Sequence, residues 1–338
     1  MRTRLTEAFG IKHPVLCAPM ALITGGRLAA AVSDAGGLGV VGGGYAGILG
    51  GEPDLQQELV HVQGRKFGVG FITWALERAP NLLDQVLAHS PDCVFLSFGD
   101  ARQFAPQIRR GGAKLICQVQ SLSHVDQAIE AGADVIVAQG TEAGGHGASR
   151  STMPFVPEVA DYLARKSPAT LLLAAGGIAD GRGLAAALML GADGVVVGTR
   201  FWASAEALTS TAVTDHAQRF TGDDTVRTTA VDALRGVSWP DEFSFRFINN
   251  KLASEWVHRE AEAKAEFGSL AAAYADARSR QDFDVVAVVA GECIGLIHDR
   301  PNAATILDAM VKQAQALLDR GSRLDFTGGA AHSTITAA

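Results

Sequence analysis

The feature of this chain that most constrains its fold is a regular alternation of short apolar runs with Ala-rich amphipathic segments. The runs are apolar on both faces, which is typical of strands in a parallel sheet covered by helices. Eight such strands within about 200 residues predict a closed (β/α)8 barrel. The alternative is a doubly wound open sheet, which a miscount of one strand would favour. The predicted strands are 15–20, 38–43, 67–72, 94–98, 115–119, 135–139, 171–175 and 195–199.

The segments between the predicted strands have the period of amphipathic helices. Residues 125–131 illustrate this period, and Gly132 follows them as a helix stop. Gly191 ends another predicted helix in the same way, shortly before the last predicted strand. The predicted helices are 26–35, 54–62, 82–89, 103–109, 125–131, 156–165 and 182–190.

The alternation of predicted strands and helices ends after Phe201. Residues 203–280 are charged and lack the pattern of parallel strands, and 255–267 is the plainest predicted helix in them. A stretch rich in valine and glycine, 284–297, then leads into a final predicted helix, 302–318.

We therefore expect an α/β TIM barrel with an additional, mostly helical domain after the eighth strand. The barrel unit would comprise residues 1–205, with a C-terminal helix from 298–338 packing back on it. Residues 206–297 would form the cap over the substrate. The small, polar tail 327–338 is expected to be disordered at its end.

The composition excludes two classes of partner. The 338 residues carry a formal net charge of −7, and lysine and arginine are scattered along the chain. Such a chain has no basic excess to displace counterions from a phosphate backbone, so nucleic acid is not expected. No apolar stretch reaches about 18 residues, so no membrane span is expected. The four cysteines are far apart with no Cys-x-x-Cys pair, which favours buried free thiols and a cytoplasmic protein.

Two glycine turns follow the last two predicted barrel strands. Gly176-Gly177 comes directly after Ala175, and Gly198-Thr199 follows the next strand. Glycines let backbone N–H groups approach an anion, and a helix that begins after such a turn adds partial positive charge. Barrels commonly bind phosphate at these two loops, so the pair predicts a phosphate-bearing ligand. The alternative is two tight turns without a ligand.

Another glycine-rich string, 37–42, has the spacing of a dinucleotide-binding motif. That motif must follow a strand and open a helix. This string instead follows a predicted helix and coincides with a predicted strand, so we do not expect a dinucleotide site there.

The sixth predicted strand ends at Gln139 and continues into a long glycine-rich loop that contains Gly144, Gly145 and His146. The two glycines would let a flat ring lie against backbone, with the histidine held over it. Imidazole suits proton transfer near neutral pH. His146 is therefore the candidate catalytic residue, and an exposed loop histidine is the alternative. Glu142 in the same loop is either an acid or base or a solvated carboxylate.

Two other strand ends contain candidate ligand contacts. Ala18-Pro19-Met20 closes the first strand and could seat a planar ring or be a packed strand end. Gln118 is polar within an apolar run and could face the ligand. The histidines show no metal-ligand spacing, so no metal site is expected, and no nucleophile–base–orienter set typical of hydrolases is present.

Together these segments resemble the nitronate monooxygenase family, formerly called 2-nitropropane dioxygenases. The similarity spans almost the whole chain. It is carried by Ala18-Pro19-Met20, Ala35-Gly36-Gly37-Leu38-Gly39, Gly144-Gly145-His146, the run from Ala175 to Gly181, Gly198-Thr199-Arg200-Phe201, and the 290–297 stretch.

The resemblance implies an FMN-dependent oxidoreductase that oxidises alkyl nitronates with O2 to a carbonyl compound and nitrite. It implies that His146 orients the nitronate or takes a proton from a nitroalkane. FMN phosphate would lie on Gly176, Gly177, Gly198 and Thr199. The isoalloxazine would lie near Ala18, Pro19, Met20, Gln139, Gly144 and Gly145, with Gln118 and Ala175 completing the cofactor-binding set.

Two departures from the family pattern bear on the substrate. The third strand ends in Gly70-Phe71-Ile72-Thr73-Trp74, and Gln118 stands where some members have lysine. The main alternative is an NAD(P)H-dependent FMN reductase of quinones or enoyl-acyl-carrier-protein. An inosine-monophosphate dehydrogenase type would need a loop cysteine that is absent here, and a non-catalytic flavoprotein would leave His146 unexplained. NAD(P)H as a second ligand and a homodimeric assembly stay open.

Overall fold

A computed structural model describes residues 1–47 and 53–321 of the chain. Its main sheet has eight parallel strands in the order β1-β9-β8-β6-β5-β4-β3-β2. A parallel bridge between Leu16 and Leu38 joins the two edge strands, and Cys17 N–H donates to the Leu38 carbonyl at 3.0 Å. The closed barrel is therefore confirmed and the open-sheet alternative is wrong. The strands are β1 (Val15–Cys17), β2 (Gly39–Gly42), β3 (Phe67–Ile72), β4 (Cys93–Ser97), β5 (Lys114–Val119), β6 (Val135–Gln139), β8 (Leu171–Ala175) and β9 (Gly194–Val197).

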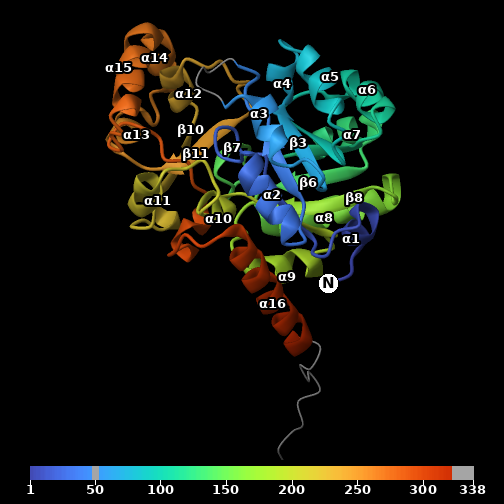
Figure 1. Ribbon diagram of the computed structural model, residues 1–338. Coiled ribbons are helices and arrows are strands. Elements are labelled where there is room, and N and C mark those ends of the chain that lie inside the picture. The colour runs from blue at the N-terminus through green and yellow to red at the C-terminus, as the bar shows by residue number, and fades with distance from the viewer. Residues whose placement is uncertain (48–52, 322–338) are drawn as a thin grey trace, which may run out of the picture.

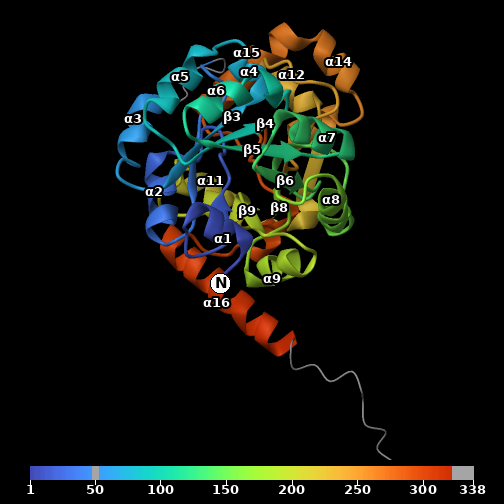
Figure 2. The same ribbon diagram turned by 90° about the vertical axis from the view of Figure 1, so that its right-hand side faces the viewer.

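Helices surround this barrel, as Figures 1 and 2 show. Each helix predicted between the barrel strands is present, with its ends shifted by a few residues. A further short helix, α4, follows β3 directly. The helices are α2 (Gly26–Asp34), α3 (Leu55–Val60), α4 (Thr73–Leu76), α5 (Asn81–Leu87), α6 (Ala105–Arg110), α7 (Leu122–Ala131), α8 (Thr152–Lys166) and α9 (Gly181–Met189).

The barrel interior is filled by side chains from alternate strand positions. Leu16, Phe95 and Leu173 belong to an inner cluster, whereas their strand neighbours pack outward against the helices. The helix α1 (Arg4–Phe9) inserts Leu5 and Phe9 into the same inner cluster. Because this helix closes the N-terminal end of the barrel, the opposite mouth is where a ligand can enter.

The segment after β9, called the cap below, contains helices and also two strands. Two of its strands pair antiparallel with each other, and the second of them also pairs antiparallel with β7 (Gly145–Gly147), which comes from the barrel loop after β6. Figure 1 shows α11 to α15 gathered on one side of the barrel. The cap elements are α10 (Thr199–Trp202), α11 (Thr211–Ala217), β10 (Thr225–Thr228), α12 (Ala230–Arg235), β11 (Ser244–Ile248), α13 (Lys251–Trp256), α14 (Glu260–Ala265) and α15 (Phe267–Ser279).

The continuous helix predicted for 255–267 is wrong. The backbone leaves the helical conformation after Trp256, and His258 has a φ of 71° before α14 begins at Glu260. A non-glycine residue in the left-handed region interrupts a helix whatever its side-chain pattern. Periodicity alone therefore could not reveal this break.

The last helix, α16 (Ala303–Gly321), packs against α9 and α2 of the barrel. It lies against α9 in both views, and its buried residues Leu307 and Met310 belong to the outer barrel cluster. The approach is close: a Cβ on Gly181 of α9 would lie 2.4 Å from the Met310 carbonyl oxygen. The tail 327–338 lies outside the described residues. Among the helices that are described, none is long and apolar enough to cross a membrane.

Candidate active site at the barrel mouth

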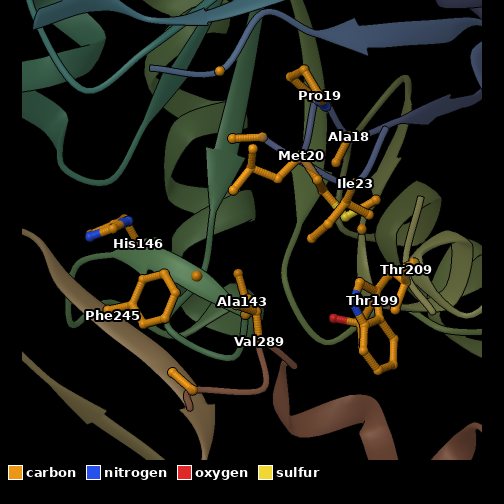
Figure 3. Close-up of a pocket in the computed structure, with 18 of the residues that line it drawn as sticks. Ala18, Pro19, Met20, Ile23, Ala143, His146, Thr199, Thr209, Phe245 and Val289 are labelled. Carbon is orange, nitrogen blue, oxygen red and sulfur yellow. The ribbon is translucent and has the colours of Figure 1, made fainter. Parts of the chain in front are cut away.

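A cavity of about 450 Å³ opens at the carboxyl ends of the barrel strands, beneath the cap. Every residue predicted to bind the cofactor or to carry chemistry lines it. Figure 3 shows His146 beside Phe245 on one side of this cavity and Thr199 on another. The predicted residues brought together are Ala18, Pro19, Met20, Gln118, Gln139, Gly144, Gly145, His146, Ala175, Gly176, Gly177, Gly198 and Thr199.

The turn after β8 needs its glycines. Gly176 and Gly177 have φ values of 101° and 73°, which L side chains rarely adopt. A Cβ on Gly176 would also lie 2.9 Å from the Gly140 carbonyl oxygen. The turn therefore presents bare backbone to the cavity, which suits the approach of an anion.

The turn after β9 has a different reason for its glycine. Gly198 has a negative φ of −102°, and an added Cβ would meet Met20 Sδ at 3.6 Å and Ala18 Cβ at 3.7 Å, which are ordinary contacts. Packing within the protein therefore does not demand glycine there, and the missing side chain leaves the cavity open. The next residue, Thr199, accepts a hydrogen bond at Oγ1 from Gly291 N–H at 3.1 Å, and its hydroxyl lines the cavity.

The helix α9 does not contribute the partial charge expected from it. Its N-cap residue Asp180 accepts a hydrogen bond from Arg182 N–H at 2.9 Å, and Gly181 N–H donates to Gln313 Oε1 at 2.7 Å. A carboxylate already counters the positive end of this helix. An anion at the barrel mouth would therefore be held by the backbone of the two turns.

His146 is held in a fixed orientation on β7. Its Nε2 lies 3.0 Å from both carboxylate oxygens of Asp232, a buried residue of α12. Because a carboxylate accepts, Nε2–H is the donor and Nδ1 is the unprotonated nitrogen. Trp239 stacks on the imidazole with ring centroids 3.3 Å apart and an interplanar angle of 10°. In the described part of the chain, Nδ1 has no hydrogen-bond partner.

Burial determines the charge of this imidazole. Desolvation lowers the pKa of His146 to about 4, although the negative charge of Asp232 acts to raise it. The nearby guanidinium groups of Arg235 and Arg227 lower it further. His146 is therefore neutral at physiological pH, with one fixed donor and one free acceptor.

Glutamine side chains support the loop that contains His146. Gln139 Nε2 donates to the His146 carbonyl at 3.2 Å. Its Oε1 accepts from Gln118 Nε2 at 3.2 Å and from Gln120 Nε2 at 2.9 Å. Gln118 thus lines the cavity and also positions Gln139.

Two arginines of the cap sheet anchor the same loop from the other side. Arg227 on β10 donates to the carbonyls of Thr141 and Ala143 at 3.0 and 2.9 Å, and Arg246 on β11 donates to that of Thr141 at 3.0 Å. Burial lowers the pKa of Arg227 to about 10, so it stays protonated. The histidine loop is therefore shared between barrel and cap.

Glu142 has neither of the roles considered for it. Its carboxylate accepts hydrogen bonds from the backbone N–H of Thr152 at 2.9 Å and from the Thr152 hydroxyl at 2.8 Å. Thr152 is the first residue of α8. The carboxylate therefore caps that helix, where negative charge is favourable.

Several residues of the site were not identified from the sequence. Arg235 and Tyr45 line the cavity, and Asp232 and Trp239 contact His146. One signal was available for Asp232: it is the single charged residue in the apolar run Ala230–Leu234, where a carboxylate requires a partner. Within residues 1–47 and 53–321, no group of three or more His, Cys, Asp or Glu side chains is arranged to hold a metal ion.

Comparison with known proteins gives consistent results. A family model described as nitronate monooxygenase matches residues 2–64 and 73–313. The nitronate monooxygenase npaC of Metarhizium robertsii is 37% identical, over 90% of this chain and 91% of that protein. A probable nitronate monooxygenase of Staphylococcus aureus is 30% identical, over 77% and 82% of the two chains. The solved structure of FabK from Thermotoga maritima superposes with a TM-score of 0.79 at 29% identity, covering 95% of this chain and 99% of FabK.

We expect the His146 imidazole to stay neutral, with the proton on Nε2, between about pH 8 and pH 5. Its lowered pKa means that protonation sets in only as the pH falls towards about 4, well below the ordinary value of 6.5. Nitrogen-15 NMR of histidine-labelled protein measures both properties, and His146→Gln assigns the resonance by its loss. Titration of that resonance near pH 6.5 would contradict the assignment.

Proposed function

Because the chain belongs to the nitronate monooxygenase family, we propose that it oxidises alkyl nitronates with O2 to a carbonyl compound and nitrite, with FMN as its cofactor. Membership of this family makes the chain an oxidoreductase. The observation that carries the proposal is a neutral, oriented imidazole on the wall of a cavity whose other wall contains two bare glycine turns.

The residues at the mouth fit FMN in two respects. A phosphate group suits the backbone of Gly176-Gly177 and Gly198-Thr199, where absent side chains leave room and the Thr199 hydroxyl lines the cavity. A flat ring system suits the small residues Ala18 and Gly145 on the facing strand ends. When bound, the flavin supplies the electron acceptor that links substrate oxidation to O2.

The protein's own contribution is proton transfer and orientation. Nδ1 of His146 is an unprotonated acceptor, so it can take the α-proton of a neutral nitroalkane. Asp232 fixes the tautomer through Nε2–H, and Trp239 fixes the plane of the ring. A preformed nitronate has already lost that proton, so for this substrate His146 is needed only for orientation.

Two further proposals concern the whole chain. We propose the division into a barrel of residues 1–205 with the C-terminal helix, and a substrate cap of residues 206–297, because the cap supplies Asp232 and Trp239 to the histidine. We also propose a cytoplasmic location, which is supported by four buried, unpaired cysteines: Cys17, Cys93, Cys117 and Cys293.

Anaerobic mixing tests the proposed activity. The purified protein should be yellow and release FMN on denaturation. Addition of an alkyl nitronate without O2 should change the flavin absorbance, and NADH or NADPH should not. If only a nicotinamide reduces the flavin, the reductase alternative is correct and nitronate oxidation is wrong.

Gly198→Asp should weaken FMN binding by at least about 100-fold, because two like charges about 4 Å apart in a partly buried site repel by several kcal/mol. This position is chosen over Gly177 because its φ is negative, so a side chain adds no left-handed strain. Gly198→Ala is the control for size. Flavin content and fluorescence titration measure the effect, and normal FMN affinity in folded Gly198→Asp would refute the phosphate assignment.

His146→Asn should retain FMN, because the phosphate contacts lie on other strands. It should lower turnover of a neutral nitroalkane by about 10²–10⁴-fold, since a base is removed. Turnover of the corresponding nitronate should fall less. His124→Asn is the matched control, since His124 lines a neighbouring pocket and pairs with Glu242 at 3.1 Å. Near-wild-type rates on both substrate forms would exclude a catalytic role for His146.

A further inference from the structure

The cavity wall beside His146 contains a guanidinium group with an unused donor. Arg235 is the last residue of α12, and its side chain is 14% exposed. It lines the same cavity as His146 and the glycine turns. Its Nη1 atom is buried and makes no hydrogen bond within the part of the chain that the structure describes. A buried donor without an acceptor is unfavourable, so its presence at a cavity requires an explanation.

The neighbours of Arg235 compensate its charge only in part. The guanidinium lies 5.0 Å from the Phe245 ring centroid and 5.6 Å from that of Tyr45, and Nη2 donates to Tyr45 Oη at 3.4 Å. Its nearest carboxylate oxygen, Asp232 Oδ1, is 3.7 Å from Nη1, which is too long for a hydrogen bond.

That carboxylate is already engaged, since both of its oxygens lie at hydrogen-bond distance from His146 Nε2. Arginine cannot lose its proton to escape burial, as lysine can. A cation whose charge is only partly compensated therefore lines the ligand space next to the candidate base.

We propose that Arg235 binds the anionic end of the substrate by pairing with two oxygens of a planar nitronate. A guanidinium presents parallel N–H donors in one plane, which matches a group with two oxygens on one atom. A nitronate has this shape and a negative charge, whereas a neutral nitroalkane has the shape without the full charge. The choice of nitronate as the anion rests on the function proposed above; the anion site itself rests on the geometry of Arg235.

The walls around this site also define the rest of the substrate. Tyr45 and Phe98 line the cavity. Trp74 and Trp239 support them through edge-to-face ring contacts with centroids 5.1 to 6.1 Å apart. The two lining rings offer apolar surface and exclude water from the anion. The substrate class is therefore a nitronate whose organic part is apolar.

The test measures anion binding without turnover. Inorganic nitrite is the probe, because it is a planar monoanion with two oxygens on nitrogen, and calorimetry on the FMN-loaded enzyme reports its affinity. Arg235→Met keeps an apolar stem against Tyr45 and Phe245 but removes the charge. Its nitrite dissociation constant should rise by about 10- to 100-fold, the range expected for a lost charge-assisted pair. Arg235→Lys, which keeps the charge but not the planar fork, should give an intermediate value.

Arg278→Met is the matched control. Arg278 lines the same cavity from α15 but is exposed to solvent, so its loss should change nitrite affinity less than about twofold. In steady-state kinetics, Arg235→Met should lower kcat/KM for a nitronate about tenfold or more, and much less for the neutral nitroalkane. This difference between substrate forms would not result from a merely structural role.

Unchanged nitrite affinity in Arg235→Met with normal FMN content overturns the proposal, as does a wild-type enzyme that binds no nitrite at millimolar concentration. If Arg235→Met fails to retain FMN, Arg235→Gln serves as a second neutral variant, judged by the same affinity. Nitrite binding that depends on Arg235 in an enzyme without nitronate turnover would refute the proposed function and leave the anion site standing.

Discussion

Three residues of the loop after β6, Gly145 to Gly147, pair as β7 with β11 of the cap, and the arrangement of the site depends on this pairing. The pairing sets His146 opposite Phe245 and makes the barrel loop the edge of the cap sheet. Arg227 and Arg246 hold the same loop through its carbonyl groups. The histidine therefore reaches Asp232 and Trp239 because barrel and cap share a strand, and a loop free of the cap would have left it in solvent.

Burial then determines the chemistry of the cluster. His146, Asp232 and Arg235 lie together under the cap, with one formal negative and one formal positive charge among them if the imidazole is neutral. Desolvation favours that neutral imidazole by lowering the pKa of His146 to about 4. The carboxylate is engaged by the histidine and the guanidinium retains a free donor, so the three side chains differ in function although they lie side by side: an acceptor nitrogen, an orienting carboxylate and a cation.

The barrel and its glycine turns could be predicted because they are local properties of the chain. A strand that is apolar on both faces, such as Val135–Gln139, has this pattern wherever it packs. The glycines at 176 and 177 mark a backbone conformation that other residues avoid. This turn can therefore also be recognised from the sequence, without knowing which residues surround it in the fold. Parallel strands place their carboxyl ends at one mouth, which is why the predicted residues from five different strands line one cavity.

The sequence by itself therefore determined the eight-stranded barrel, the glycine turns at its mouth and the histidine loop. Only the tertiary structure decided which residues from the cap join that loop. Asp232 lies 86 residues from His146 in the chain, and no periodicity links the two. The antiparallel pairing of β7 with β11 joins two short segments. The sequence pattern of one segment does not specify the other as its pairing partner. The charge of His146 and the free donor of Arg235 follow from burial and distance, which exist only once the cap closes over the barrel.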